Sequence, residues 1–367
     1  MTLNVGPQHP ATHGVLRMKM LLDGERIVDA EPIIGYLHRG SERLGEMGTY
    51  LQFIPYTDRM DYLAAIHNNM AFVHACEKLA DLDVPPRANV LRVLAQEINR
   101  VASHLIWMGT FGIDIGAMTT FFWCFRDRER ALRLLERMTG TRLTYSYMRF
   151  GGVKHDVDED WIQDTREWVD QVREGIQELD DLLTENDIFV ARTKGTGVVS
   201  TEQAIDYGMT GPNLRATGKA FDLRKEEPYA SYETYDFDVP TSDEGDVFAR
   251  YACRMAEIEE SLGIVEQACD RWADAEGNHL SREVGEGSSQ FRWSPPEGEA
   301  YGRIESPRGE LGCLVVSDGS NQPYRVKMRA HSFSNLSAIS ELARGELIQD
   351  AIITLGSLDI VLGDIDR

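Results

Sequence analysis

The chain has 367 residues, of which 42% are hydrophobic, so it is long enough for one large or two ordinary globular domains. It carries 38 basic and 60 acidic side chains, which give a net charge of −22. An acidic surface repels nucleic acid and anionic lipid, which argues against both as direct partners. The acidic residues are dispersed along the chain rather than gathered in a tail, which indicates a protein adapted to high salt.

The five cysteines include no CxxC pair. This fits a reduced, cytoplasmic protein and offers no zinc or iron–sulfur framework. No basic-then-apolar leader opens the sequence, so no secretory signal is expected. Residues 101–125 carry only two ionisable side chains other than cysteine, His104 and Asp114, and are long enough to span a bilayer. Because glycines interrupt this run, the sequence favours two buried helices that meet at a glycine-rich corner.

Residues 1–58 are predicted to be rich in β-strands, with a hairpin turn at Asp23-Gly24. Before that hairpin, residues 6–14 read GPQHPATHG and include His9 and His13. The two prolines fix φ and remove backbone donors, so the stretch is a stiff loop and not a helix. Imidazole titrates near pH 6.5 and can therefore deliver a proton to a bound molecule. A strand connection with solvated histidines accounts for the loop equally well.

Helical periodicity begins at Arg59 and predicts an antiparallel bundle over residues 59–273. Apolar residues repeat at 3–4 spacing on both sides of Pro85-Pro86, which separate the first two helices. Residues 185–245 are predicted to be an irregular insertion with short strands and loops. The further amphipathic helices are predicted over residues 119–138, 159–184 and 246–273.

Residues 274–367 are predicted to hold a polar linker, a small sheet and two short helices. The turn signal Asp318-Gly319 separates the last two strands. The fold class is therefore mainly α with small β regions (α+β). The chain has no internal repeat, no P-loop and no GxGxxG fingerprint. The three strands are predicted over residues 302–306, 310–317 and 324–330.

Several long stretches, in order from residue 3 to residue 367, carry a resemblance to a known family. They read VGPQHPATHGVLR, GYLHRGSE, YTDRMDYL, RVASHLIWMGT, YMRFGGVK, IESPRGELG, SDGSNQPYRVKMR and DIVLGDIDR. Together they closely resemble the NuoD-type (49-kDa) subunit of respiratory complex I, a family related to the large subunit of nickel–iron hydrogenases. The resemblance implies a hydrogenase-large-subunit-like helical bundle with N- and C-terminal sheets.

The related hydrogenases hold nickel and iron with two CxxC pairs. These cysteines align here with Asp61, Ala64, Val361 and Asp364, so no thiolate remains and no metal is expected to be bound by this chain. This disfavours the alternative of a membrane-bound, hydrogenase-like large subunit. A structural assembly subunit with an inactive cavity is a second alternative.

The resemblance implies that electrons pass from the terminal 4Fe–4S cluster of a NuoB-type partner to a quinone at the interface of the two subunits. It maps the contacts of the quinone headgroup to His13 and Tyr62, and the carboxylate partner of that histidine to Asp114. His9 lines the same loop, and Arg59 maps to the arginine beside the cluster. A phenol and an imidazolium can each donate a hydrogen bond and then a proton, and a buried carboxylate stabilises the imidazolium.

Taken singly, these residues have ordinary interpretations: Tyr62 as a core aromatic, Arg59 as a helix-start residue and Asp114 as a helix cap. The spacing of Arg59 and Tyr62 would place both on one helix face. Many family members carry a histidine near the cluster at the position of Thr144. Threonine does not titrate near neutral pH, which favours a lower-potential acceptor such as menaquinone.

The resulting hypothesis is a subunit of a proton-pumping NADH-quinone oxidoreductase-type translocase. Its expected partners are NuoB-, NuoC-, NuoI- and NuoH-type subunits, and it would lie on the cytoplasmic face of the membrane, which it touches only through them. The electron donor is left open among NADH, a reduced deazaflavin and ferredoxin. The remaining histidines, His331 among them, are interpreted as structural or surface groups, and Arg308 and Glu310 as architectural.

Overall fold

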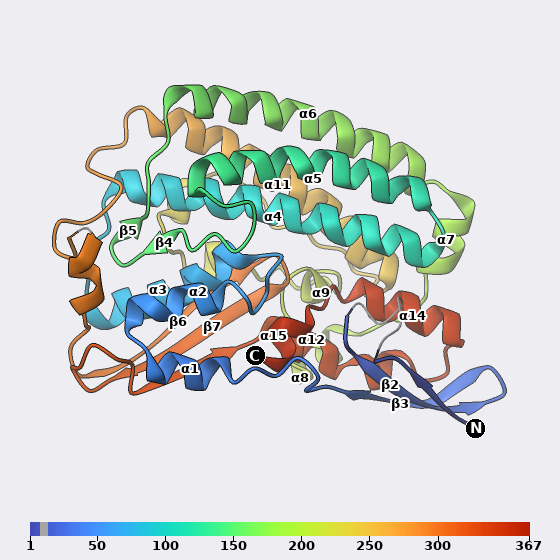
Figure 1. Ribbon diagram of the computed structural model, residues 1–367. Helices are drawn as coiled ribbons and strands as arrows, with labels where there is room; N and C mark the ends of the chain where they lie inside the picture. Colours follow the sequence, from blue (N-terminus) through green and yellow to red (C-terminus); the bar gives the residue numbers. More distant parts are fainter. Residues whose placement is uncertain (8–13, 286) are drawn as a thin grey trace.

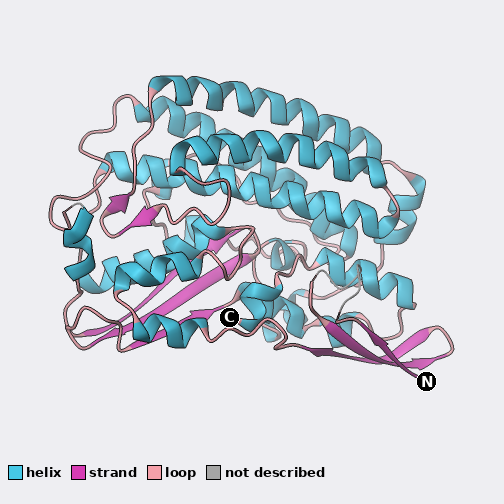
Figure 2. Ribbon diagram, viewed as in Figure 1, coloured by secondary structure: helices cyan, strands magenta, loops and turns pink. Residues whose placement is uncertain are grey.

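The computed structural model describes residues 1–7, 14–285 and 287–367. Its long helices pack together as a bundle, and the larger sheets and most short helices lie below this bundle in the view (Figure 1). Helix dominates, and the longer strands lie near the two ends of the chain (Figure 2). The predicted fold class is therefore confirmed. The long helices are α4 (Pro86–Ile115), α5 (Met118–Thr139), α6 (Glu159–Leu183) and α11 (Val247–Trp272).

Helices α4 and α5 meet at the glycine-rich corner that the sequence predicts. Gly116 ends α4 with a φ of +96°, a conformation that glycine adopts without steric cost. Gly109 and Gly112 do not interrupt the helix but let α5 approach it, since a Cβ on Gly112 would lie 2.0 Å from Thr120 Oγ1. In the described part of the chain, no helix is long and apolar enough to cross a membrane.

The N-terminal sheet is antiparallel, with strand order β1-β2-β3 and the predicted turn at Gly24. Alternate side chains of β2 are buried, because successive residues of a strand point to opposite faces. The buried side chains, Met18 and Met20 among them, belong to one core with residues of the C-terminal helices α13 (Ile339–Leu342) and α14 (Ile348–Ser357). The strands are β1 (Thr2–Val5), β2 (Arg17–Asp23) and β3 (Arg26–Ile33).

The C-terminal sheet is also antiparallel, with strand order β6-β7-β8. Helix α3 (Ala65–Ala80) lies on it so closely that a Cβ on Gly302 would be 2.6 Å from the Ala75 backbone nitrogen. The sheet thereby supports α3 (Figure 1). The strands are β6 (Gly298–Ser306), which starts four residues earlier than predicted, β7 (Gly309–Ser317) and β8 (Arg325–Arg329).

The periodicity predicted that the first long helix begins at Arg59. In the structure it begins at Ala65, so this prediction is wrong. Two shorter helices, α1 (Ser41–Met47) and α2 (Tyr50–Thr57), come before it. Residues 58–64 form a turn between α2 and α3. Asp61 holds this turn through a contact with Arg308, a residue distant in the sequence, and helical periodicity does not reveal such a contact.

Residues 185–245, all of which are described, form short helices and loops, so the prediction of short strands there is wrong. Polar side chains explain the helices: Asn186, Ser200 and Asp222 each accept a backbone N–H at a helix start. The remaining short elements are β4 (Met148–Arg149), β5 (Gly152–Val153), α7 (Asp187–Thr193), α8 (Thr201–Asp206), α9 (Pro212–Arg215), α10 (Leu223–Glu226), η2 (Tyr232–Thr234), η3 (Gly287–Arg292), α12 (His331–Ser337) and α15 (Leu362–Asp366).

Candidate functional site

Tyr62 and Arg59 both lie in the turn 58–64, so the prediction that they share one helix face is wrong. The Tyr62 side chain is 41% exposed. Burial of the rest of the ring raises the pKa of its hydroxyl above the ordinary value, which keeps the phenol protonated at neutral pH. The half-exposed Arg59 guanidinium donates a hydrogen bond to the Pro55 carbonyl at 2.6 Å.

Asp61, between them, holds the turn from the inside. Its Oδ1 accepts the backbone N–H groups of Leu63 and Ala64, each at 3.2 Å. Its Oδ2 accepts a hydrogen bond from Arg308 Nη1 at 3.0 Å, and both side chains are fully buried. Burial opposes ionisation of Asp61, but the Arg308 charge, together with the contact with His331 and the Ala64 N–H, outweighs burial and holds the pKa of the carboxyl well below its usual range. The turn is therefore anchored by an ion pair.

The C-terminal helix α15 lies against the same turn. A Cβ on Gly363 would be 3.3 Å from Tyr62 Cδ1, and a Cβ on Gly14 would be 3.3 Å from Leu362 Cδ2. Tyr62 and Gly14 thus pack against consecutive residues of one segment. The predicted site residues His9 and His13, which precede Gly14, lie outside the described residues.

Asp114 lies in the last turn of α4, where its side chain is half-buried. Two turns earlier on the same helix, Trp107 Nε1 donates to the Gly356 carbonyl of α14 at 2.8 Å. This contact brings the C-terminal part of α4 to the C-terminal segment of the chain. The predicted pairing of Asp114 with His13 stays a prediction.

Thr144 lies in the loop after α5, with a φ of +55° and a partly exposed side chain. Two residues later, the Ser146 N–H donates to Asp58 Oδ2 at 3.0 Å, and Arg59 Nη1 lies 3.5 Å from the same oxygen. Burial of Asp58 raises the pKa of its carboxyl to about 7. The structure therefore brings the Thr144 loop and Arg59 together around one buried carboxyl.

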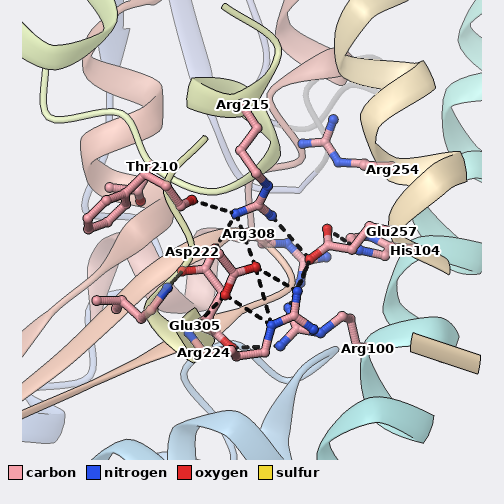
Figure 3. Close-up of polar contacts among 12 residues, drawn as sticks. Arg100, His104, Thr210, Arg215, Asp222, Arg224, Arg254, Glu257, Glu305 and Arg308 are labelled. Atoms are coloured by element: carbon pink, nitrogen blue, oxygen red, sulfur yellow. Dashed lines mark hydrogen bonds and ion pairs between the residues drawn. The ribbon is translucent and has the colours of Figure 1, made fainter. Parts of the chain in front are cut away.

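Figure 3 shows a set of buried charges, Arg308 among them, that the sequence did not predict. Arg308, besides its contact with Asp61, donates to Asp359 Oδ1 and to Ser103 Oγ, each at 2.9 Å. Glu257 of α11 accepts hydrogen bonds from three arginines and lies 3.0 Å from His104 Nε2. The fully buried members around Glu257 are Glu97, Arg100, His104, Arg215, Asp222, Arg224 and Glu305.

One signal could have revealed these charges. Glu97, Arg100 and His104 recur at 3–4 spacing within the apolar helix α4, where a charge needs a partner in the core. The partners themselves come from distant segments and could not be named. The interpretation of Arg308 as architectural agrees with its buried contacts.

No group of three or more His, Cys, Asp or Glu side chains is arranged to hold a metal ion in residues 1–7, 14–285 and 287–367. Asp61 and Asp364, which the family resemblance would align with hydrogenase cysteines, each contact another side chain of the protein. Arg308 contacts Asp61, and His331 Nδ1 lies 2.7 Å from Asp364 Oδ2.

Comparison with known proteins identifies the family. Residues 114–367 match the family described as respiratory-chain NADH dehydrogenase, 49 Kd subunit. The D-type subunit of NADH-quinone oxidoreductase from Bacillus cytotoxicus is 51% identical over 366 residues, which cover 100% of this chain and 98% of that protein. The D-type subunits of the same enzyme from Bacillus anthracis and Geobacillus thermodenitrificans are 51% and 50% identical over the same shares of both chains. This chain therefore belongs to the 49-kDa subunit family of respiratory-chain NADH dehydrogenase, as its sequence motifs predicted.

Proposed function

We propose that this chain binds the quinone headgroup of a complex I-type oxidoreductase, with Tyr62 and His13 as donors to its two carbonyl oxygens. The observation that carries the proposal is the Tyr62 hydroxyl, a protonated and partly exposed donor on a turn that the buried Asp61–Arg308 pair holds in place. Reduction of a quinone takes up two electrons and two protons, so a group that donates a hydrogen bond and then a proton suits it.

The electrons would come from the 4Fe–4S cluster of a NuoB-type partner. Arg59 and the Thr144 loop lie together around Asp58, and we place this face toward that partner. The permanent charge of Arg59 favours the reduced, more negative state of a nearby electron carrier. Because Tyr62 is open to solvent in this chain, a partner that covers it would exclude water from the reaction.

The same proposal includes the other subunits of the complex. NuoC-, NuoI- and NuoH-type subunits would complete the complex, and this chain would lie on the cytoplasmic face and touch the membrane only through them. Thr144 does not titrate near neutral pH, which supports menaquinone as the acceptor. Asp114 would stabilise the imidazolium of His13.

The experiment that tests this function compares Tyr62→Phe with Tyr56→Phe in the assembled complex. Tyr56, on α2, is 43% exposed and provides a matched control. Loss of the Tyr62 hydroxyl should lower quinone reduction by roughly 10²–10⁴-fold, the usual contribution of a positioned proton donor. Stability should change by about 1 kcal/mol or less, so that the complex still assembles. Full activity of Tyr62→Phe would show that the Tyr62 hydroxyl is not a donor to the quinone and that Tyr62 is merely a core aromatic.

The pairing of His13 with Asp114 is tested by His13→Ala, Asp114→Asn and the double variant. Two groups that act as a unit lose their joint effect when either is removed. The double variant should therefore be little worse than the poorer single one. Losses that multiply would show that the two side chains act independently.

A further inference from the structure

His331, the first residue of α12, is a fully buried histidine with carboxylates on both sides of its ring. Its Nδ1 lies 2.7 Å from Asp364 Oδ2, and its Nε2 lies 3.4 Å from Asp61 Oδ2 and 3.1 Å from Ser306 Oγ. The Ser332 N–H is within reach of both Nδ1, at 2.8 Å, and Asp364 Oδ2, at 3.0 Å. When Nδ1 carries a proton, it cannot accept a hydrogen bond, so the Ser332 N–H donates to the Asp364 carboxylate instead.

The charges around His331 balance only when its ring is protonated. Three carboxylates, Asp61, Asp359 and Asp364, lie in this buried region. Two arginines face them: Arg308 pairs with Asp61 and Asp359, and Arg254 Nε lies 3.9 Å from Asp359 Oδ2. A neutral His331 would leave one buried carboxylate without a counter-charge, which is costly in a region closed to water.

The pKa of His331 is consistent with this balance. Burial alone lowers the pKa of an imidazole. Here the charge of Asp364 and the hydrogen bonds to Asp364 and Asp61 outweigh burial, and the pKa of His331 rises to about 9. The ring is therefore charged throughout the neutral range.

Both carboxylates that His331 contacts belong to segments that pack against Tyr62. Asp61 directly precedes Tyr62 in the turn 58–64, and Asp364 directly follows Gly363, which lies against the tyrosine ring. We infer that His331 is a buried imidazolium that joins these two segments and acts as the positioning residue for Tyr62. The inference rests on the proposed function of Tyr62, because it explains how the phenol is kept in one orientation on an open surface.

A charge-compensation experiment in the assembled complex tests the inference. His331→Gln removes the cation between the carboxylates of Asp61 and Asp364. Asp61 keeps its ion pair with Arg308, but Asp364 loses its counter-charge, which should lower quinone reduction by about tenfold or more. Asp364→Asn in the same chain removes one of the two negative charges. The double variant should therefore be more active than His331→Gln alone. A double variant as poor as His331→Gln, or poorer, would show that His331 contributes shape rather than charge and would overturn the inference.

A second measurement uses the full chain and does not depend on quinone activity. The pKa of His331 is higher in the folded protein, at about 9, than the ordinary 6.5, so its contribution to stability is fully present below pH 6.5 and is lost as the pH rises to about 9. The difference in unfolding free energy between the unmodified chain and His331→Gln should shrink across this window. A difference that does not change with pH would contradict the inference.

The two proposals can fail separately. If Tyr62→Phe is inactive while His331→Gln is fully active, the positioning role is wrong and the quinone site stands. If Tyr62→Phe is fully active, the proposed function fails. The pH window of His331 in the full chain would then still report whether the ring is an imidazolium.

Discussion

Gly363 lies against the ring of Tyr62, and this contact makes the glycine a sensitive position. A Cβ there would be 3.3 Å from Tyr62 Cδ1 and 2.4 Å from the Met60 carbonyl oxygen. The second contact is with backbone, so the turn 58–64 or helix α15 has to move. We expect Gly363→Ala to lower quinone reduction several-fold and to destabilise the chain by about 1–3 kcal/mol, the range for overpacking. Turnover of the assembled complex and denaturant unfolding of the chain check this.

The matched control is Gly263→Ala in the interior of α11, where an added Cβ meets no atom within 4 Å. Alanine stabilises a helix interior over glycine by roughly 0.5–1 kcal/mol. Gly263→Ala should therefore leave turnover unchanged and raise stability slightly. Equal activity of the two variants would show that the position of Tyr62 is not set by α15.

Local patterns predicted the long helices because the signal for them is local. In α6, Trp161, Thr165, Trp168, Val172 and Leu179 are buried at the spacing of one helix face. The hairpin at Gly24 was predicted for the same reason. Each of these features depends on residues within a few turns of one another.

The turn that carries the candidate site could not be predicted in this way. Its cause is the ion pair of Asp61 with Arg308, whose partners are 247 positions apart in the sequence. Arg100 and Glu257, in the buried network, are 157 positions apart. Tyr62 was named as a site residue only through the family resemblance, because its own neighbourhood reads as the start of a helix.

The Thr144 position allows a test of the face proposed for the NuoB-type partner. The φ of +55° at Thr144 is one that histidine tolerates better than most residues. Thr144→His should raise the reduction potential of the partner's cluster and make it depend on pH between about 6 and 8, because imidazole titrates there and threonine does not. Redox titration of the assembled complex, followed by electron paramagnetic resonance at several pH values, measures both effects. A steep pH dependence in the unmodified complex would contradict the prediction and point to another titrating group, such as His155.

The net charge of −22 predicts that the folded chain needs salt. Raising the ionic strength from about 0.1 M to 1 M shortens the Debye length from about 10 Å to 3 Å and screens repulsion between exposed carboxylates. Buried ion pairs are affected much less. We expect the melting temperature to rise with NaCl, and sucrose serves as a control that stabilises without screening charge. Equal stability in dilute buffer and in 1 M NaCl would remove the argument for a high-salt habitat.

Among the buried charges, Glu257 is predicted to be the one whose removal lowers the stability of the folded chain most. Arg100, Arg215 and Arg224 donate to its Oε1 at 3.1–3.3 Å, and His104 Nε2 lies 3.0 Å from its Oε2 (Figure 3). Glu257→Gln removes the negative charge that these buried cations share and should destabilise the chain by about 3–5 kcal/mol. Glu259→Gln, two residues along α11, is the control, because Glu259 is exposed and its ion pair with Arg173 is worth about 1 kcal/mol or less.

The stability lost in Glu257→Gln should also depend on pH, and it should be smaller in acid than at neutral pH. Burial opposes ionisation of this carboxyl, but Arg215, His104 and Arg100 hold its pKa well below the ordinary 4.5. A carboxyl whose pKa is lower in the folded than in the unfolded chain contributes stability above pH 4.5, and that contribution is lost as the pH falls below it. The unfolding free energies of the unmodified chain and Glu257→Gln should therefore differ most at neutral pH and converge in acid. Denaturant titrations between about pH 3 and pH 7 test this. A difference in unfolding free energy that stays constant over this range would mean that Glu257 acts through packing and not through its charge.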